Sequence, residues 1–321
     1  MLAFIFSLNC VAPIFLLIAL GGLLRRWGVL SRPVIETFNT VAFTVALPLL
    51  LFRDIAMSDI RQLFAPAFIL YATGATVVGF ALTWWLAERF MKDRTAIGAF
   101  VQGSYRGNYA IIGLFLIINI LGHSGKGALI TAFAIPVYNV LAVIVLSVRS
   151  KNPQPVNLWR TLWNIAKNPL ILGIVAGVPF SVWQIPLFTT PDTHFVATTV
   201  ESLAVIANPL ALLAIGASIS RSKLRADWPK AITATVIKLI ISPALFTGLA
   251  FLLRRPLGFN GDDLLVLMIM FAVPTAVASY IMAGKMHNDE ELAANIVLLT
   301  SLFSVFTLTA GIYLFKSTGI I

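Results

Sequence analysis

Charged residues are scarce in this 321-residue sequence: they make up 11% of the chain, whereas 59% of the residues are hydrophobic. Because a soluble domain carries about 25% charged residues, this composition excludes an ordinary soluble fold and predicts an all-α polytopic membrane protein. The single cysteine, Cys10, excludes an internal disulfide and a cysteine-based metal cluster. The three histidines are scattered without metal-ligand spacing. We therefore expect no metal site and no cofactor.

Acidic residues are also few, and none of the thirteen lies at the centre of an apolar run. Glu36 and Glu201 come about one turn inside their runs, and the others fall in loops or at run ends. Sodium sites and proton relays usually place a carboxylate near the middle of the membrane. Sodium coupling is therefore not expected, and proton coupling would have to use Glu36, Glu201 or the substrate itself. No motif of catalytic residues stands out, so the chain is not expected to be an enzyme.

Long hydrophobic runs dominate what is present. A span needs about 17–25 apolar residues, and ten runs qualify: 4–24, 33–52, 64–86, 96–121, 127–148, 168–185, 197–220, 231–253, 264–284 and 292–315. The polar segment 150–167, with Pro153 and Pro155, is expected to be a cytoplasmic linker. It divides the chain into two five-helix repeats, residues 1–149 and 168–321.

The lysines and arginines predict the orientation of these spans. If the N-terminus lies outside, fifteen basic residues fall in inside loops and six in outside loops. Cytoplasmic loops carry the excess of Lys and Arg, so both termini are expected outside a plasma (inner) membrane. The formal net charge of +10 then reflects these loops, and no nucleic-acid partner is expected.

Five spans per half would place two similar halves in the membrane with opposite orientations. Weak internal likeness supports this: Pro48 and Pro209 occupy similar apolar segments 161 positions apart. The fourth span is interrupted by the polar stretch 102–109, and the ninth carries Pro274 at a comparable place. Interrupted helices at corresponding places in two inverted halves indicate the site of a secondary transporter.

Arg106 is the strongest site candidate, because it lies near the centre of the fourth span. A charge at that depth costs about 2.5–3.5 kcal/mol, and Gly103 and Gly107 loosen the helix beside it. The planar guanidinium suits bidentate contact with a carboxylate, and Asn108 offers an amide next to it. Half-helix N-termini would add positive dipole ends. The alternative is a structural arginine that caps carbonyls freed by the glycines.

Other polar residues within the spans are weaker candidates. Lys238, seven residues into the eighth span, either contributes to the site or reaches back to the membrane surface. The remaining candidates either line the site or form interhelical hydrogen bonds; they are Tyr138 and Asn139 in the fifth span and Ser279 and Tyr280 in the ninth.

Taken in order, these segments resemble the auxin efflux carrier (AEC) family along nearly the whole chain. The likeness is carried by Leu47-Pro48, Arg106-Gly107-Asn108-Tyr109 with Gly113, Pro136-Val137-Tyr138-Asn139-Val140, Lys167-Asn168-Pro169-Leu170, Asn208-Pro209-Leu210-Ala211-Leu212, Lys238-Leu239 and Pro274-Thr275-Ala276. The resemblance implies ten helices in a 5+5 inverted repeat, with broken helices four and nine crossing at the substrate site. One departure is Gly113-Leu114-Phe115, where the family usually has a Gly-x-Pro pattern, so glycines must open the fourth helix.

The sequence therefore predicts a secondary active transporter for a small organic anion, a carboxylate such as malate or malonate. An uncoupled anion channel would need a continuous polar stripe along several spans, and an integral-membrane enzyme or sensor is disfavoured by the layout of acids and histidines. The expected partners are the substrate and membrane lipid; the anion, the coupling ion and the oligomeric state stay open, with a homodimer as one alternative. The predicted substrate-binding residues are Arg106, Gly107, Asn108, Tyr109, Tyr138, Asn139, Lys238, Pro274, Thr275, Ser279 and Tyr280.

Overall fold

The structure is a computed structural model that describes residues 2–150, 166–188, 190, 193–218 and 228–321, together with the single positions 159 and 163. Over these residues the chain is helical and has no β-strand, only one isolated β-bridge. The prediction of an all-α fold is therefore confirmed. Most of the predicted linker 150–167 lies outside the described residues, so the boundary between the two halves stays a prediction.

Seven helices or continuous helical segments in the described part of the chain are long and apolar enough to cross a membrane, as predicted for a polytopic protein. They are Leu2–Arg26, Arg32–Ala56, Pro66–Phe90, Gly125–Val148, His194–Ser218, Trp228–Leu252 and Glu290–Ser317. The predicted spans 96–121, 168–185 and 264–284 are instead interrupted or short helices. The count of ten spans stays a prediction.

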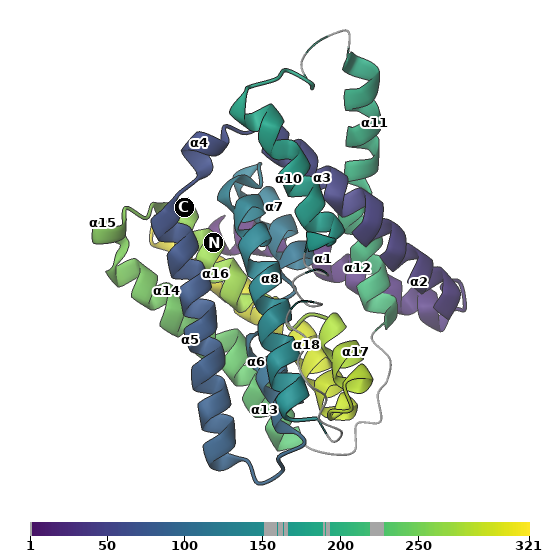
Figure 1. Ribbon diagram of the computed structural model, residues 1–321, viewed down its shortest axis with the longest axis vertical. Coiled ribbons are helices and arrows are strands. Elements are labelled where there is room, and N and C mark those ends of the chain that lie inside the picture. The colour runs from purple at the N-terminus through teal and green to yellow at the C-terminus, as the bar shows by residue number, and fades with distance from the viewer. Residues whose placement is uncertain are drawn as a thin grey trace.

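One bundle is formed by helices from two separate parts of the sequence, residues 2–56 and 169–218 (Figure 1). It contains α1 (Leu2–Arg26), the continuous segment α2 (Arg32–Val41), η1 (Ala42–Ala46) and α3 (Leu47–Ala56), and then α10 (Pro169–Val182), α11 (His194–Val205) and α12 (Ala207–Ser218). Within it, α1 packs on α12 and α3 packs on α10. Short α4 (Ile60–Leu63) leads away from this bundle.

The second bundle holds the two interrupted helices. The first consists of α6 (Ile97–Tyr105), η2 (Tyr109–Gly113) and α7 (Leu114–Leu121), and the second of α16 (Gly261–Ala272) and α17 (Ala278–Lys285). Around them lie α5 (Pro66–Phe90), α8 (Gly125–Val148), the continuous segment α13 (Trp228–Val236), η4 (Ile237–Ile241) and α14 (Ser242–Leu252), short α15 (Arg254–Leu257), and α18 (Glu290–Ser317). Figure 1 shows α5 and α8 covering one side of this bundle.

Close backbone contact holds the first bundle together. A Cβ atom at Gly21 of α1 would overlap the carbonyl of Leu213 in α12, and one at Gly177 of α10 would lie 2.8 Å from the carbonyl of Phe52 in α3. In a membrane, small residues at helix contacts let backbones approach and gain van der Waals packing. The glycines therefore position α1 and α10 directly against their partner helices.

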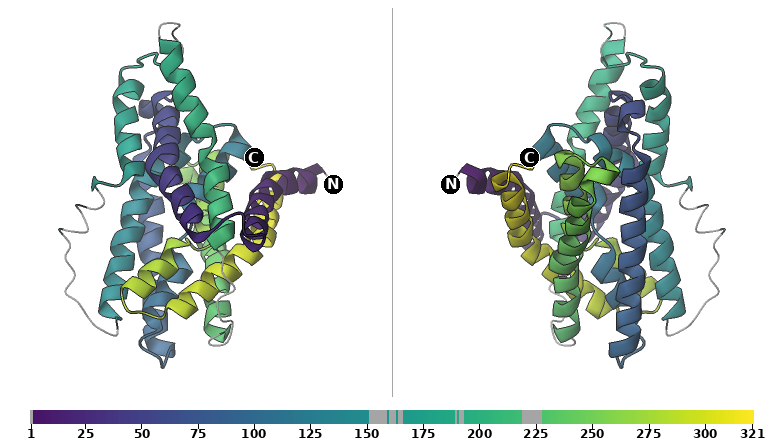
Figure 2. Two further views of the ribbon diagram at one scale, coloured as in Figure 1. Left: turned by 90° about the vertical axis from the view of Figure 1, so that its right-hand side faces the viewer. Right: turned by 90° about the vertical axis from the view of Figure 1, so that its left-hand side faces the viewer.

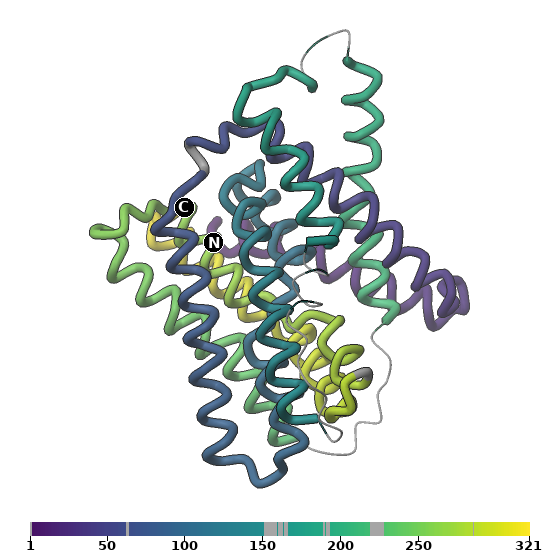
Figure 3. Tube along the Cα trace, viewed as in Figure 1, coloured from purple at the N-terminus to yellow at the C-terminus, as the bar shows by residue number. Residues whose placement is uncertain are grey.

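Helices α1 and α18 join the two bundles. They pack against each other and lie together on one side of the molecule (Figure 2). The Lys316 ammonium lies 4.8 Å from the centre of the Phe6 ring, so the end of α18 is next to the start of α1. The chain trace accordingly brings the two termini into one region of the molecule (Figure 3).

Candidate functional site

The two interrupted helices cross where each stops. Helix α6 ends at Tyr105, and the segment resumes as η2 at Tyr109. Helix α16 ends at Ala272 and α17 begins at Ala278. The interruption of the ninth predicted span at Pro274 is thus found. The fourth is also broken, although no proline follows Gly113; three non-helical residues and a π-helix take up the break.

Backbone hydrogen bonds fasten the two breaks to each other. The Asn108 amide donates to the Pro274 carbonyl at 2.7 Å, and the Ala276 amide donates to the Arg106 carbonyl at 3.1 Å. They flank the isolated antiparallel bridge between Gly107 and Thr275. Buried backbone groups left free by a helix break must find partners, and here each break supplies them to the other.

The Arg106 guanidinium is buried at this crossing, with the residue 9% exposed. Its Nη2 donates to Asn139 Oδ1 on α8 at 2.9 Å. The hydrogen-bond network orients the Gln102 amide so that its oxygen accepts from Arg106 Nη1 at 3.1 Å and its nitrogen donates to the Ser279 carbonyl at 3.2 Å. The Met282 sulfur also lies against Nη1. No carboxylate of the described residues forms an ion pair with Arg106.

Arg106 lines a cavity of about 470 Å³ between the two bundles. The second bundle contributes the crossing residues together with Tyr138 and Asn139, and the first contributes Asn39 and Thr44. Every described residue that lines the cavity, other than Arg106, is uncharged. Since a guanidinium has five N–H donors and the protein contacts occupy only some of them, the cavity can receive a carboxylate without displacing Asn139 or Gln102.

Three helical segments begin at the wall of this cavity. They start at Tyr109 of η2, at Pro169 of α10 and at Ala278 of α17, and the cavity lining includes all three starting residues. Helix N-termini carry partial positive charge and free N–H groups, which favour bound anions. Their convergence adds to the single positive charge of Arg106.

The predicted site residues fall into three groups. Six of the predicted residues line the Arg106 cavity: Arg106, Gly107, Asn108, Tyr109, Tyr138 and Asn139. Tyr280 lines a second cavity next to it. Four do not line either cavity: Lys238, Pro274, Thr275 and Ser279.

Lys238 and Thr275 stabilise the crossing through hydrogen bonds to backbone carbonyls. The Lys238 ammonium, in a residue only 1% exposed, donates to the Phe271 carbonyl in the last turn of α16 at 2.7 Å. A cation at a helix C-terminus balances the negative end of the helix dipole. The Thr275 hydroxyl donates to the Gly103 carbonyl of α6 at 2.6 Å. Both side chains therefore support the arrangement of the two broken helices.

Sequence reasoning missed several polar residues of the cavity. Asn39, Thr44, Asn168 and Ser218 all line it, and Gln102 contacts the guanidinium. The only sequence signal for them is that a small polar residue lies within or at the end of an apolar span. Many residues that form structural hydrogen bonds have the same signal, so it does not identify a site.

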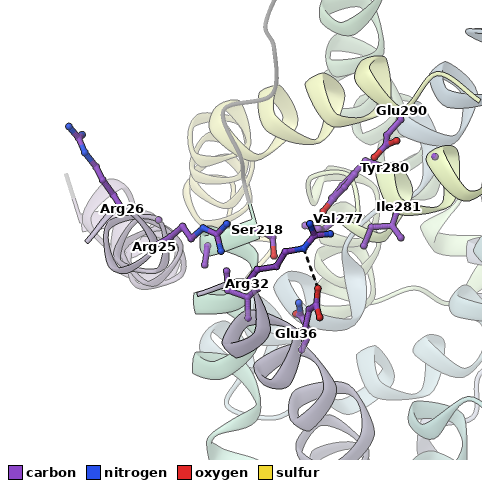
Figure 4. A pocket seen from close by; sticks show the side chains of 14 residues that line it. Arg25, Arg26, Arg32, Glu36, Ser218, Val277, Tyr280, Ile281 and Glu290 are labelled. Carbon is purple, nitrogen blue, oxygen red and sulfur yellow. Dashed lines mark hydrogen bonds and ion pairs between the residues drawn. The ribbon is translucent and has the colours of Figure 1, made fainter. Parts of the chain in front are cut away.

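A larger cavity of about 1140 Å³, here called the entrance cavity, adjoins the first (Figure 4). The two cavities share Asn39, Ser218, Val277 and Ile281 as lining residues. The entrance cavity extends to Arg25 at the end of α1 and Arg32 at the start of α2. The larger cavity therefore lies between the Arg106 cavity and that end of the molecule.

Broken helices that cross beside a buried cation, in a chain with several apolar spans, indicate a membrane transport protein. The chain belongs to the membrane transport protein family, whose model matches residues 6–159 and 156–312. This confirms the resemblance to the AEC family.

Similar proteins agree with that membership. The chain is 28% identical over 317 residues to a protein of Rhizobium meliloti (strain 1021) named "Putative malonate transporter", covering 96% of this chain and 95% of that protein. It is 23% identical over 308 residues to an "Uncharacterized transporter" of Methanothermobacter thermautotrophicus, covering 95% and 97% of the two chains. Both similarities extend along nearly the full length of each protein.

Proposed function

We propose that this membrane transporter is a secondary active carrier of a small organic anion, with short carboxylates such as malonate and malate as its substrate class. The observation that carries this proposal is the environment of Arg106: a buried guanidinium, with neutral partners among the described residues, beside a cavity in which every other lining residue is uncharged. A buried charge without a counter-ion is costly, and an anionic substrate would supply that counter-ion. The name of the Rhizobium meliloti relative agrees with a carboxylate.

In this mechanism a substrate carboxylate accepts hydrogen bonds from the free N–H groups of Arg106. The three helix N-termini around the cavity stabilise its negative charge. The amides of Asn39, Asn108 and Asn168 can bond to the rest of a short, polar substrate. Because the cavity lies between the two bundles, a movement of one bundle against the other would change the side from which it is reached.

We further propose that the fold is a ten-helix 5+5 inverted repeat, with residues 1–149 and 168–321 as its halves. The contact of α1 with α12 and the contact of α10 with α3 are equivalent under such a repeat, because they join the first span to the seventh and the sixth to the second. At these contacts the carbonyls of Leu213 and Phe52 pack against Gly21 and Gly177. Leu213 and Phe52 are 161 positions apart in the sequence, as are Pro209 and Pro48.

The test of the substrate class is uptake by purified protein in proteoliposomes. Labelled malonate and malate should enter with saturable kinetics, and an uncharged diester should not compete. Arg106→Ala should abolish uptake in a protein that still folds and inserts. Arg106→Lys should be nearly as damaging, since it keeps the charge but loses the bidentate geometry.

The matched control is Arg89→Ala, which removes an exposed cation at the end of α5 and should leave uptake unchanged. A charge-assisted hydrogen bond contributes roughly 1.5–3 kcal/mol. Arg106→Lys loses one of the two bonds between the guanidinium and the substrate carboxylate, so it should weaken substrate affinity by about tenfold or more. Normal uptake by Arg106→Ala would show that the arginine is structural and would refute the proposal. Flux that fails to saturate would indicate a channel instead.

A further inference from the structure

Among the described residues, the Arg106 cavity contains a single formal charge. Its lining includes the Arg106 guanidinium and no acid. The other buried cation of the second bundle, Lys238, does not line the cavity, and its ammonium donates to the Phe271 carbonyl. Lys167 precedes the lining residue Asn168, but it is exposed and lies outside the lining. The described lining therefore balances one negative charge on a substrate.

The charges of the entrance cavity do not change this balance. Figure 4 shows Arg32 joined to Glu36 by an ion pair, which is 3.3 Å long. Arg26 points away from the cavity (Figure 4), so the remaining charged residues of its described lining are Arg25 and Glu290, which have opposite charges. The charges that face this cavity cancel, and it offers no counter-ion for a second negative charge.

A fully ionised dicarboxylate would bring one charge too many into the Arg106 cavity. Its first carboxylate would pair with Arg106, whereas the second would lie among neutral amides and apolar side chains such as Ile135 and Ile215. An ionised carboxylate without a cation in such a site is strongly disfavoured, and the group takes up a proton instead. The charge balance therefore favours the singly protonated form.

The amides of the lining suit a neutral carboxyl group. Asn168 Oδ1 accepts from the Leu170 amide at 2.9 Å, so the Asn168 NH2 group remains as a donor. Asn39 and Asn108 add side-chain amides that each contain an acceptor oxygen and a donor nitrogen. A protonated carboxyl group has one O–H donor and a carbonyl acceptor. Neutral partners of both kinds are thus present in this cavity.

The acids that could relay a proton from within the spans lie elsewhere. Glu36 is exposed and pairs with Arg32, and Glu201 is exposed and lies 3.9 Å from Arg53. Neither lines the Arg106 cavity. The titratable groups within the described elements around the crossing are tyrosines, which stay protonated at neutral pH, and one bound lysine: Tyr105 on α6, Tyr109 on η2, Tyr138 on α8, Tyr280 on α17 and Lys238 on η4. The charged residues of α8, α16 and α18 lie at the ends of these helices.

We propose that the protein carries dicarboxylates in their singly protonated form, with the carboxylate on Arg106 and the carboxyl group on the neutral amides of the cavity. This inference rests on the proposed function and specifies the charge of its substrate. Each dicarboxylate crosses with one proton of its own and one net negative charge. A pH gradient acts on uptake through the concentration of this monoanion, and no carboxylate of the described residues has to relay the proton.

The test compares malonate with malonamate, its monoamide, in proteoliposomes at constant membrane potential and internal pH. Malonamate has one negative charge throughout, and its amide imitates the neutral carboxyl group. Between about pH 5 and 8 outside, the KM for total malonate should rise by about tenfold for each pH unit above the second pKa of malonate, because the monoanion becomes scarcer by that factor. The KM for malonamate should stay constant.

A second cation in the cavity should allow the dianion to bind. Asn39→Lys places one on α2 at the cavity wall, and it should lower the KM for malonate at about pH 8 by roughly tenfold, while the KM for malonamate should not fall. Thr40→Lys is the matched control, because it adds a cation at the next position, which is exposed and outside both described linings. Thr40→Lys should leave both KM values unchanged.

A KM for malonate that stays constant or falls as the pH rises would show that the dianion is carried, and it would overturn the inference. So would a KM for malonamate that rises in parallel, because the pH would then act on the protein. Uptake of malonate without uptake of malonamate would also overturn it, since the second negative charge would then be needed. If the protein carries neither compound nor malate, the proposed function fails and the inference fails with it.

Discussion

Gly107 lies where the breaks of the two helices pair, in the isolated bridge with Thr275. A Cβ atom there would lie 2.8 Å from Val273 Cγ2, 3.2 Å from Lys238 Nζ and 3.3 Å from the Met270 carbonyl. Two of these neighbours belong to the interrupted second helix, and the third is the lysine that caps it. Glycine is therefore required by the close approach of backbone and side chains at the crossing.

We expect Gly107→Ala to lower both the thermal stability and the substrate affinity. Overpacking costs about 1–3 kcal/mol, and relief of the clash would push the segment 106–108 away from its partner and displace Arg106. Gly74→Ala in α5 and Gly248→Ala in α14 are matched controls, since a Cβ at either position meets nothing within 4 Å. Each control should be neutral or slightly stabilising in thermal denaturation. A Gly107→Ala protein with normal melting temperature and KM would show that the crossing is not tightly fitted.

At the scale of elements, an ion pair fastens α8 to α16. Lys126 Nζ lies 2.7 Å from Asp263 Oδ1, and the Asp263 side chain is 2% exposed whereas that of Lys126 is 22% exposed. Asp263 also closes the capping box of α16 with Asn260. The loss of stability should depend on which partner is removed. A Lys126 without its partner can turn toward solvent, whereas an Asp263 carboxylate without its partner stays buried.

Lys126→Met should therefore destabilise the protein strongly. It would leave the buried Asp263 carboxylate without its cation, at a cost of about 3 kcal/mol or more. Asp263→Asn should cost less, since Asn keeps a capping oxygen and Lys126 can turn toward water. The neighbouring exposed Asp262→Asn is the control. Thermal denaturation in detergent would give the order of stabilities, and a larger loss for Asp263→Asn than for Lys126→Met would contradict this account.

The elements that local chemistry controls could be predicted from sequence. Gly107 and Pro274 mark the two helix breaks, because glycine and proline weaken a helix at their own positions. Arg106 was identified because a charge in an apolar span is costly wherever the span packs. The residues of the first bundle at the cavity, such as Asn39 and Ser218, could not be found in this way, since their place depends on how two bundles pack over long range.

Lys238 illustrates a related limit. Its position within an apolar span marks it as unusual, and the sequence left two alternatives open: a place in the substrate site, or a side chain that reaches back to the membrane surface. Its contact with Phe271 O depends on the end of α16 arriving beside η4. A helix taken alone gives no indication of which carbonyl a lysine will meet. The role of Lys238 in substrate binding stays a prediction.

For the whole molecule, we expect transport to be independent of sodium. Among the described residues, no carboxylate lines the Arg106 cavity, and sodium sites in transporters usually include one. Uptake of malonate should be the same when sodium is replaced by potassium at constant pH and membrane potential. Loss of uptake after the replacement would show that sodium is coupled through groups outside this cavity.

The orientation of the molecule can be tested by labelling. Cys10 is the single cysteine of the sequence, so its replacement by Ala gives a background without thiols. We expect Ser317→Cys to react with membrane-impermeant reagents and Ser222→Cys, which lies outside the described residues, to react only with permeant ones. The expectation rests on the excess of basic residues in the loops assigned to the cytoplasm. The reverse pattern would place the entrance cavity on the outer face.

Two of the three π-helical segments in the described part of the chain line the Arg106 cavity, and the third carries the lysine that caps α16. Phe43 and Thr44 of η1 and Tyr109 of η2 line the Arg106 cavity, and η4 carries Lys238. A π-turn holds one residue more than an α-turn, so it acts as a dislocation that can travel along a helix. As it passes, side chains rotate by about 100°, the angle between successive residues of an α-helix, while both helix ends stay fixed. Movement of a π-turn by one residue can thus change which side chains line the cavity, while each helix keeps its place in the membrane.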